Sequence, residues 1–290
     1  MPKYSLICCV SKPDIFENVL LKSITRERHN HDIEIIPIIN NDNRYSASNA
    51  LNVAIDSARA DHVIVAHQDV ELLSGGRTDC VGWFDKLDEI IDGQSDDWAI
   101  LGSAGIALKY GSADVGKWGG ALKTDTVAIG SVWHSDEALN EEPYWNGIKD
   151  TLLAHCCDEC LMVINRKKGM RFDSQFHGFH FYGVDICLQA RAAGYKVLCS
   201  DLPIIHYGKY SASMVGQTRY WHYLRFIHNK WKYRFPEMFG THMHWNKEGL
   251  TSYINFEMES DDGLHVEVKA MGIRDMHLTT DKNQGFLKYD

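Results

Sequence analysis

The chain has 290 residues, of which 44% are hydrophobic and 24% are charged, and it carries a formal net charge of −9. This length and composition are typical of a folded globular protein, with either one large α/β domain and an appendage or two small domains. The acidic balance argues against the basic surface that nucleic-acid binding requires, so we expect no nucleic-acid partner. No apolar run reaches the roughly 18 residues of a membrane span, and no signal-peptide core precedes the first strand, which predicts a cytoplasmic protein without a transmembrane span.

The first third of the chain predicts strands that alternate with helices. Short apolar runs at 5–10, 33–39 and 62–66 are typical of buried strands. Apolar residues at helical spacing lie between them at 15–24 and 50–58, and Ser46 can cap the second helix. This alternation predicts the α/β class, with a mostly parallel central sheet and flanking helices.

The remainder of the sequence predicts further elements and then a change of pattern. We expect a strand and a small-residue loop at 98–106, strands at 161–165 and 197–205, and a helix at 184–193 that ends at Gly194. A basic, aromatic helix at 220–235 follows, and then a hairpin at 253–269 around Asp261-Asp262-Gly263. We therefore predict a main domain at 1–210 and a helix and hairpin appendage at 211–290.

Polar residues follow several of the predicted strands, where an open parallel sheet binds its ligands. They are Ser11, Asn40 to Asn43, His67 to Asp69, and His206. An acidic protein holds a nucleotide diphosphate only with a divalent cation, which prefers carboxylate oxygens and, for manganese, also imidazole. Asp69 and His206 are therefore the candidate metal ligands, and His67 either is a third ligand or orients the site. The competing interpretation is that such residues form turns or helix caps.

Two blocks resemble a known family. Arg44 to Ala50 with His62 to Val70, and Phe172-Asp173 with Gly178 to Tyr195, are similar to the family-two-like glycosyltransferases of the A-type fold. In that family an Asp-x-Asp motif usually ends the strand. His67-Gln68-Asp69 stands in its place here, which resembles a bacterial branch with a His-Gln-Asp motif. The resemblance covers roughly residues 3–208.

The resemblance implies a metal-assisted transfer of a sugar from a nucleotide diphosphate sugar, which in that family is often UDP-linked, to an acceptor hydroxyl. It implies Mn²⁺ or Mg²⁺ as cofactor, held by Asp69, and a glycan or a lipid-linked molecule as acceptor. It places Asp158, Phe179 and Tyr182 beside the sugar or the acceptor. The donor-binding residues that we predict on this basis are Val10, Ser11, Asn40, Asn41, Asp42, Arg44, Asn49, His67, Gln68 and Asp69.

The general base is the point where this sequence departs from the family. Inverting relatives usually carry an acidic pair in the second block, and one of its carboxylates deprotonates the acceptor. Tyr182 and Gly183 occupy those positions here, so that Asp185 is what remains of the acidic cluster. Asp185 is either the base or a helix cap, and His180 is the substitute base. Inverting transfer is therefore a hypothesis.

Two further segments have alternative interpretations. Cys156-Cys157-Asp158-Glu159-Cys160 could form a zinc site, but no second cysteine pair supplies the remaining ligands, and we favour a buried strand. The helix at 220–235 either packs its aromatic face on the main domain, which we favour, or contacts the inner face of a membrane through Lys230, Lys232 and Arg234.

Two other functions compete with sugar transfer. A non-catalytic nucleotide-sugar or carbohydrate-binding protein would explain the missing carboxylates at Tyr182 and Gly183. A sugar nucleotidyltransferase would use a similar sheet and metal, but it generally has a Gly-rich loop after the first strand, and Ser11-Lys12-Pro13 is not such a loop.

Overall fold

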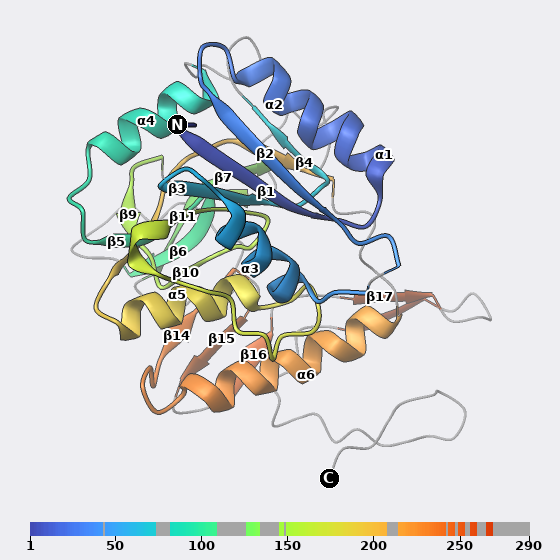
Figure 1. Ribbon diagram of the computed structural model, residues 1–290. Helices are drawn as coiled ribbons and strands as arrows, with labels where there is room; N and C mark the ends of the chain where they lie inside the picture. The colour runs from blue at the N-terminus through green and yellow to red at the C-terminus, as the bar shows by residue number, and fades with distance from the viewer. Residues whose placement is uncertain are drawn as a thin grey trace.

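A mixed seven-stranded sheet lies at the centre of the molecule, with helices on both sides (Figure 1). The computed structural model describes residues 1–42, 44–73, 82–108, 126–133, 145–147, 149–207, 214–241, 243–246, 249–252, 256–259 and 265–268. The strand order is β2-β1-β3-β11-β5-β12-β9. These strands are β1 (Tyr4–Val10), β2 (Ile33–Ile39), β3 (His62–Ala66), β5 (Trp98–Gly102), β9 (Leu152–Leu153), β11 (Leu161–Asn165) and β12 (Lys196–Cys199).

A second sheet follows the order β10-β6-β7-β13-β4, with β8 paired to β7. It is formed by β4 (Val70–Leu72), β6 (Ala104–Leu108), β7 (Thr126–Trp133), β8 (Trp145–Asn146), β10 (Cys156–Cys157) and β13 (Ile204–His206). A small sheet joins β14 (Met238–Phe239), β15 (Met243–Asn246) and β16 (Gly249–Ser252), and a separate hairpin joins β17 (Phe256–Glu259) to β18 (His265–Val268).

Helices alternate with the first strands, as the sequence predicted. The first helical segment comprises α1 (Pro13–Ile15), a π-helix (Phe16–Leu21) and α2 (Lys22–Glu27). The others are α3 (Ala47–Ser57), α4 (Trp83–Asp92), a 3₁₀ turn (Arg166–Lys168), α5 (Tyr182–Ala192) and α6 (Met214–Trp231). Two local predictions are confirmed: the Ser46 hydroxyl caps α3 by accepting from the Asn49 N–H, and α5 ends before Gly194, whose φ of +86° suits glycine.

The α/β class is confirmed, but the central sheet is less parallel than we predicted. β1 pairs in parallel with β2 and β3, and β12 with β5, whereas β11 runs antiparallel to both β3 and β5. An apolar run reveals a buried strand but not its direction. β10 and β11 run in the same direction, and both pair antiparallel with the β5 and β6 segment, from Cys156 opposite Ile106 to Ile164 opposite Ile100.

Two predicted strands are each divided between the two sheets. The segment at 98–106 forms β5 in the central sheet and β6 in the second sheet, with a bend at Ser103. The segment at 197–205 forms β12 and β13, separated by residues 200–203. Pro203 lies in this break, where its lack of an N–H is tolerated. The division carries His206 into the second sheet, beside β4.

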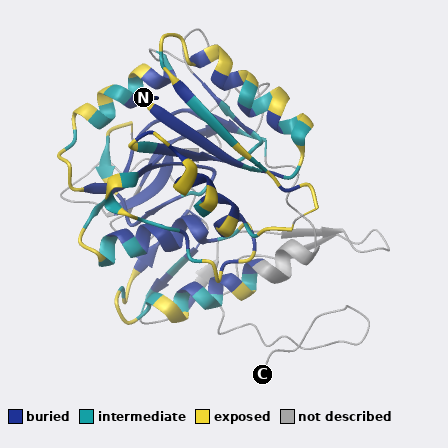
Figure 2. Ribbon diagram, viewed as in Figure 1, coloured by how far each residue is buried: buried dark blue, intermediate teal, exposed yellow. Residues whose placement is uncertain are grey.

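Helix α6 packs on the main body of the protein rather than standing apart from it (Figures 1 and 2). Its residues Tyr220, Tyr223, Leu224 and Ile227 are buried in the same apolar cluster as Val65 and Met162 of the central sheet. The predicted packing of an aromatic face is therefore confirmed. Lys230, one of the three basic residues considered for a membrane contact, is paired with Asp173 and Asp185.

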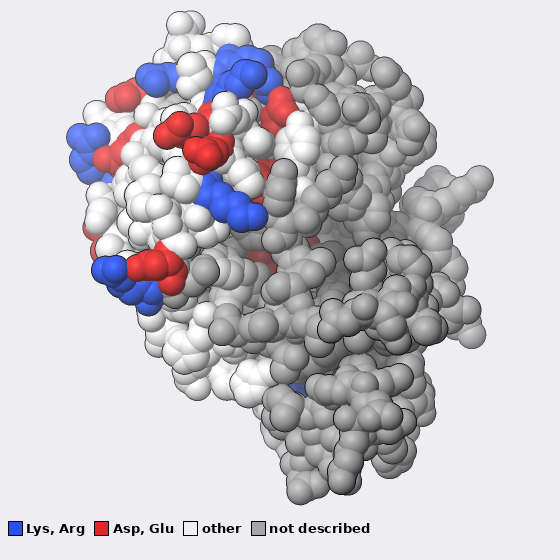
Figure 3. Space-filling model, turned by 90° about the vertical axis from the view of Figure 1, so that its right-hand side faces the viewer, with Lys and Arg blue, Asp and Glu red and all other residues white. Residues whose placement is uncertain are grey.

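The hairpin prediction is confirmed, since β17 and β18 pair antiparallel, while the Asp261-Asp262-Gly263 turn lies outside the described residues. Within the part of the chain that is described, no helix has the length and apolarity needed to cross a bilayer. On the face shown in Figure 3, the described basic and acidic side chains lie next to one another instead of forming a patch of one sign.

Candidate metal and donor site

His67, Asp69 and His206 converge at one edge of the two sheets. The His67 Nδ1 lies 3.4 Å from the His206 Nε2, and that atom lies 3.6 Å from the Asp69 Oδ1. One ligand atom from each residue lies within 4.8 Å of the other two. Ligands at right angles around a small divalent cation lie about 3 Å apart, because each is roughly 2.1 Å from the ion. The three ligand atoms therefore need to approach one another only slightly to bind a divalent cation.

Strand pairing explains why residues so distant in sequence meet. His67 follows β3, and its N–H donates to the Cys160 carbonyl. Asp69 immediately precedes β4, which pairs antiparallel with β13 in a register that sets His206 opposite Val70. The Tyr207 N–H donates to the Asp69 carbonyl at 3.0 Å and closes this junction. The sequence predicted these three ligands, and the structure brings them together.

The protonation states of the triad suit metal binding. Burial, assisted by the charge of His206, lowers the pKa of His67 to about 4, against the opposing effect of Asp69. Burial favours a raised pKa for Asp69, but the neighbouring His206 and His67 outweigh it and lower that pKa to about 2. At neutral pH the His67 imidazole is therefore neutral and the Asp69 carboxylate is ionised, which are the forms that bind metals.

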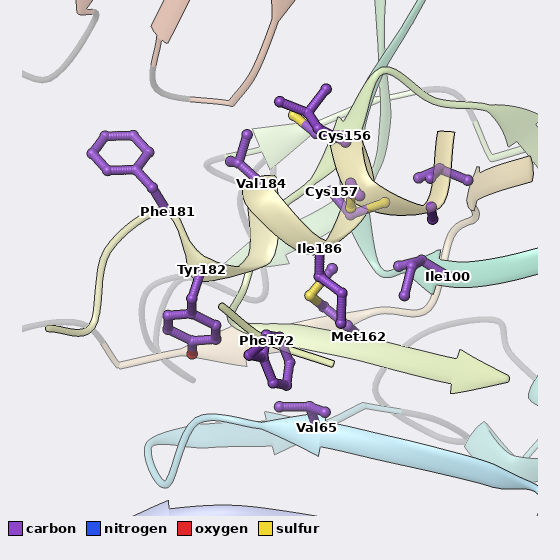
Figure 4. Packing of buried hydrophobic residues seen from close by; sticks show 14 of the residues in the cluster. Val65, Ile100, Cys156, Cys157, Met162, Phe172, Phe181, Tyr182, Val184 and Ile186 are labelled. Carbon is purple, nitrogen blue, oxygen red and sulfur yellow. The ribbon is translucent and has the colours of Figure 1, made fainter. Parts of the chain in front are cut away.

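Tyr182 fixes the orientation of the His67 ring. Its hydroxyl lies 2.9 Å from the His67 Nε2, and its side chain is buried. Tyr182 begins α5 and points toward Phe172, whereas Phe181 points away from that pair (Figure 4). In the tautomer that leaves Nδ1 free for a cation, the Nε2–H donates to the tyrosine oxygen. The residue that replaces a family carboxylate thus supports a candidate metal ligand.

Gln68 ties the end of β3 to the loop after β1. Its Oε1 accepts from the N–H groups of Ser11 and Lys12 at 3.0 and 2.8 Å, and its Nε2 donates to the Ser11 hydroxyl. The middle residue of the His-Gln-Asp motif therefore shapes the loop at the predicted donor site. Sequence reasoning placed Gln68 and Ser11 on one ligand but did not predict that they bond to each other.

The other predicted donor residues lie at or near the same strand ends. Buried Asn40 accepts from the Tyr45 N–H and donates to the Tyr45 carbonyl, and its own N–H donates to the carbonyl of buried Val10. This arrangement holds the loop after β2 against β1. Four exposed residues lie beyond it on the loop and on the first turn of α3, and they are Asn41, Asp42, Arg44 and Asn49. Asp42 and Arg44 form an ion pair with each other.

The predicted sugar-facing residues lie on two segments near α5. Asp158 accepts from the Cys160 N–H and from the Thr241 hydroxyl, so a residue from the predicted appendage contacts this carboxylate. The Phe179 side chain is 38% exposed, which leaves an aromatic surface in the loop before α5. Asp158 also acts electrostatically on His67, which shows that it lies near the triad.

The two predicted bases have very different surroundings. Asp185 is fully buried, and its carboxylate accepts from Lys230, from the Trp231 indole at 2.7 Å and from Gln189 at 2.7 Å. These contacts join α5 to α6. His180 is partly exposed and stacks edge-on against Tyr220, and its charge contributes to the low pKa of His67. His180 therefore acts on the candidate metal site, whereas the contacts of Asp185 are with α6 and with its own helix.

The cysteine-rich segment contains buried thiols, as favoured. Cys156 and Cys157 form β10, and burial raises the pKa of both thiols, which keeps them protonated. Their sulfurs lie against backbone carbonyls of Phe239 and Leu198. The residue of this segment that sequence reasoning overlooked is Glu159, whose Oε1 accepts from the Phe181 N–H at 3.0 Å.

Comparisons with known proteins give few matches in sequence. No family model matches the chain. A curated protein of Fuscovulum blasticum, described as ATP synthase subunits region ORF 6, is 28% identical over 148 residues. The match spans 51% of this chain and 52% of that protein, so the chain spans about half the length of this relative.

Two solved glycosyltransferase structures resemble the fold distantly. One is GalNAc-T7 with UDP, GalNAc and Mn²⁺, at 10% identity and a TM-score of 0.44, covering 71% of this chain and 44% of that chain. The other is a mutant Drosophila β1,4-galactosyltransferase 7 with manganese, UDP-Gal and xylobiose, at 10% identity and a TM-score of 0.36, covering 70% and 65% respectively. At such scores we rest no functional argument on them.

Proposed function

We propose that this protein is a metal-dependent glycosyltransferase of the A-type fold that uses a UDP-linked sugar donor. The observation that carries the proposal is the convergence of Asp69, His206 and His67 at the strand ends, within 4.8 Å of one another, with the His67 imidazole neutral and the Asp69 carboxylate ionised. The His-Gln-Asp resemblance independently assigns this position to the metal and diphosphate. The resemblance points to Asp69 as the metal ligand, and the geometry adds His67 and His206 beside it.

The donor set favours manganese over magnesium. Two imidazoles and one carboxylate suit manganese, whereas magnesium prefers oxygen ligands and retains its water. His67 would bind through Nδ1, His206 through Nε2 and Asp69 through a carboxylate oxygen. A bound cation would offset the charge that develops on the leaving diphosphate.

The protein's own residues would bind the nucleotide and position the sugar and the acceptor. Gln68 holds the Ser11 and Lys12 loop in place, so that this loop and the Asn40 loop flank the nucleotide. Phe179 offers an aromatic face to the sugar or the acceptor, and Asp158 lies beside them. The acceptor hydroxyl would attack the anomeric carbon from the face opposite the diphosphate, giving inversion.

A thermal-shift screen tests this proposal. The wild type and Asp69→Ala are heated with UDP, GDP, CDP and dTDP and with their sugars, each with and without manganese. A ligand that binds the folded state raises the midpoint by mass action, so we expect a manganese-dependent rise with UDP or UDP-sugars that Asp69→Ala abolishes. Asp32→Ala, at an exposed acidic position just before β2, is the control and should keep most of the shift.

Two results would contradict the proposal. A wild type that shows no shift with any nucleotide, at millimolar ligand, would remove the donor site. A UDP-dependent shift without sugar release in any acceptor screen would favour the alternative function, a non-catalytic nucleotide-sugar-binding protein.

A further inference from the structure

The proposed reaction needs a proton acceptor near the triad, and the contacts of Asp185 indicate a structural role for that residue instead. The acceptor hydroxyl must lose its proton, and a base must come within hydrogen-bond reach of that hydroxyl. Asp185 is fully buried, and its two oxygens accept from Lys230, Trp231 and Gln189. Both oxygens of Asp158 are engaged as well, by Cys160 and Thr241.

Glu159 occupies the space that a side chain at position 183 would require. A Cβ built on Gly183 would lie 2.7 Å from the Glu159 Cβ and 3.2 Å from its Oε2. These distances are too short for a side chain at 183, so the start of α5 packs directly against residue 159. The Glu159 carboxylate, on the segment between β10 and β11, therefore lies beside position 183, where α5 itself has no carboxylate.

The start of α5 fixes this carboxylate in place. The Glu159 Oε1 accepts from the Phe181 N–H at 3.0 Å, and Phe181 has a left-handed φ of +63°, which costs a non-glycine residue of order 1 kcal/mol. A helix N-terminus stabilises a negative charge. The Glu159 carboxylate is thereby held at the start of α5.

Glu159 is also connected to the candidate metal site through a single side chain. Its charge acts on Tyr182, whose hydroxyl lies 2.9 Å from the His67 Nε2. Glu159 is partly exposed, whereas Asp185 is fully buried. A carboxylate that is partly exposed, rigidly held and one residue away from a metal ligand has the properties of a general base.

We infer that Glu159 is the catalytic base of the proposed transfer, in place of Asp185 or His180. The inference rests on the proposed function. The acceptor O–H attacks the anomeric carbon, the bond from that carbon to the diphosphate oxygen breaks, and the diphosphate leaves with the electron pair. The acceptor proton passes to the Glu159 carboxylate and later to solvent. A glycoside, a nucleoside diphosphate and one proton are the products.

Glu159→Gln is the decisive variant, because its amide oxygen can still accept from the Phe181 N–H while the side chain can no longer take a proton. The variants Glu159→Gln, His180→Asn and Asp185→Asn are compared with the wild type and with Glu89→Gln, a control at an exposed glutamate on α4. UDP release is measured from UDP-glucose, UDP-galactose and UDP-N-acetylglucosamine with manganese, with water and with para-nitrophenyl glycosides as acceptors.

We expect Glu159→Gln to lower kcat about 100-fold to 10,000-fold, while the UDP-dependent thermal shift and the donor KM stay within about threefold of the wild type. In Glu159→Gly, added sodium formate should restore part of the turnover, and sodium chloride at equal ionic strength should not. A residue with only a structural role would show no formate rescue.

The outcomes separate the two proposals. Wild-type turnover in Glu159→Gln, or a comparable loss in His180→Asn or Asp185→Asn with no formate rescue at 159, would overturn the assignment of Glu159 and leave the glycosyltransferase intact. A wild type that neither binds UDP nor releases it from any donor would overturn the proposed function, and the base assignment with it.

Discussion

Several side chains at the candidate site hold a neighbouring side chain in position, and Tyr182 is the clearest case. Its hydroxyl pairs with the His67 Nε2 and sets which ring nitrogen faces His206. We predict that Tyr182→Phe lowers manganese affinity about 10-fold to 100-fold, the usual cost of losing such an outer contact. Manganese titration by calorimetry measures this. Tyr4→Phe, which removes a hydroxyl bonded to Asp88, should leave the affinity unchanged.

His155 makes the stability of the fold depend on pH. Its ring is buried, neither ring nitrogen has a hydrogen-bond partner among the described residues, and burial, with a smaller effect of Arg191, lowers its pKa to about 4. The unfolded chain protonates near pH 6.5, so the unfolded state binds more protons between pH 6.5 and 4. Stability is therefore full above pH 6.5 and falls as the pH drops toward 4, by roughly 3 kcal/mol at most.

We predict that His155→Leu reduces this acid-induced loss, which urea unfolding at pH 7.5, 6 and 4.5 measures. Because His67 also has a lowered pKa, part of the loss should remain in the variant. An identical pH dependence in the wild type and the variant would show that His155 does not carry the effect.

At the scale of elements, the junction of α5 and α6 depends on one buried carboxylate. Asp185 accepts from Lys230 and Trp231 of α6 and from Gln189 of its own helix. We predict that Asp185→Ala destabilises the fold by about 3–5 kcal/mol, since it leaves buried partners uncompensated. Asp173→Ala removes the more exposed partner of Lys230 and should cost less than about 1 kcal/mol.

Chemical denaturation of both variants tests this assignment. A stable Asp185→Ala that has lost turnover would instead support Asp185 as the base, as the sequence suggested. The opposite pattern, an unstable variant whose folded fraction still binds UDP, would agree with a structural role.

At the scale of the whole molecule, the apolar core contains residues from both sides of the domain boundary that we predicted at 210/211. Tyr220, Leu224 and Ile227 are buried with residues of the central sheet, and Thr241 bonds to Asp158. Burial of each large apolar side chain contributes roughly 1.5–3 kcal/mol. We therefore predict that a chain of residues 1–210 does not unfold cooperatively in urea, as the full chain should. Cooperative unfolding of residues 1–210 would show an independent domain.

The sequence was sufficient for the elements and for part of the site. Apolar runs and their spacing located β1, β2, β3, β11 and α5, because burial of alternate or continuous residues depends on local periodicity. Polar residues at strand ends, with the family resemblance, indicated His67, Asp69 and His206 as candidate ligands, and the structure places these three side chains together. Local chemistry also located the Ser46 cap and the end of α5 at Gly194.

Only the tertiary structure decided how those parts are used. The direction of β11 and the division of 197–205 between two sheets depend on pairing with distant strands, which no local pattern encodes. The contacts of Asp185 and Glu159 were equally hidden, because the partners of Asp185 lie 45 and 46 residues away and Glu159 meets Phe181 across 22 residues. Residue type determined which groups could act, and long-range packing determined the surroundings of each of them.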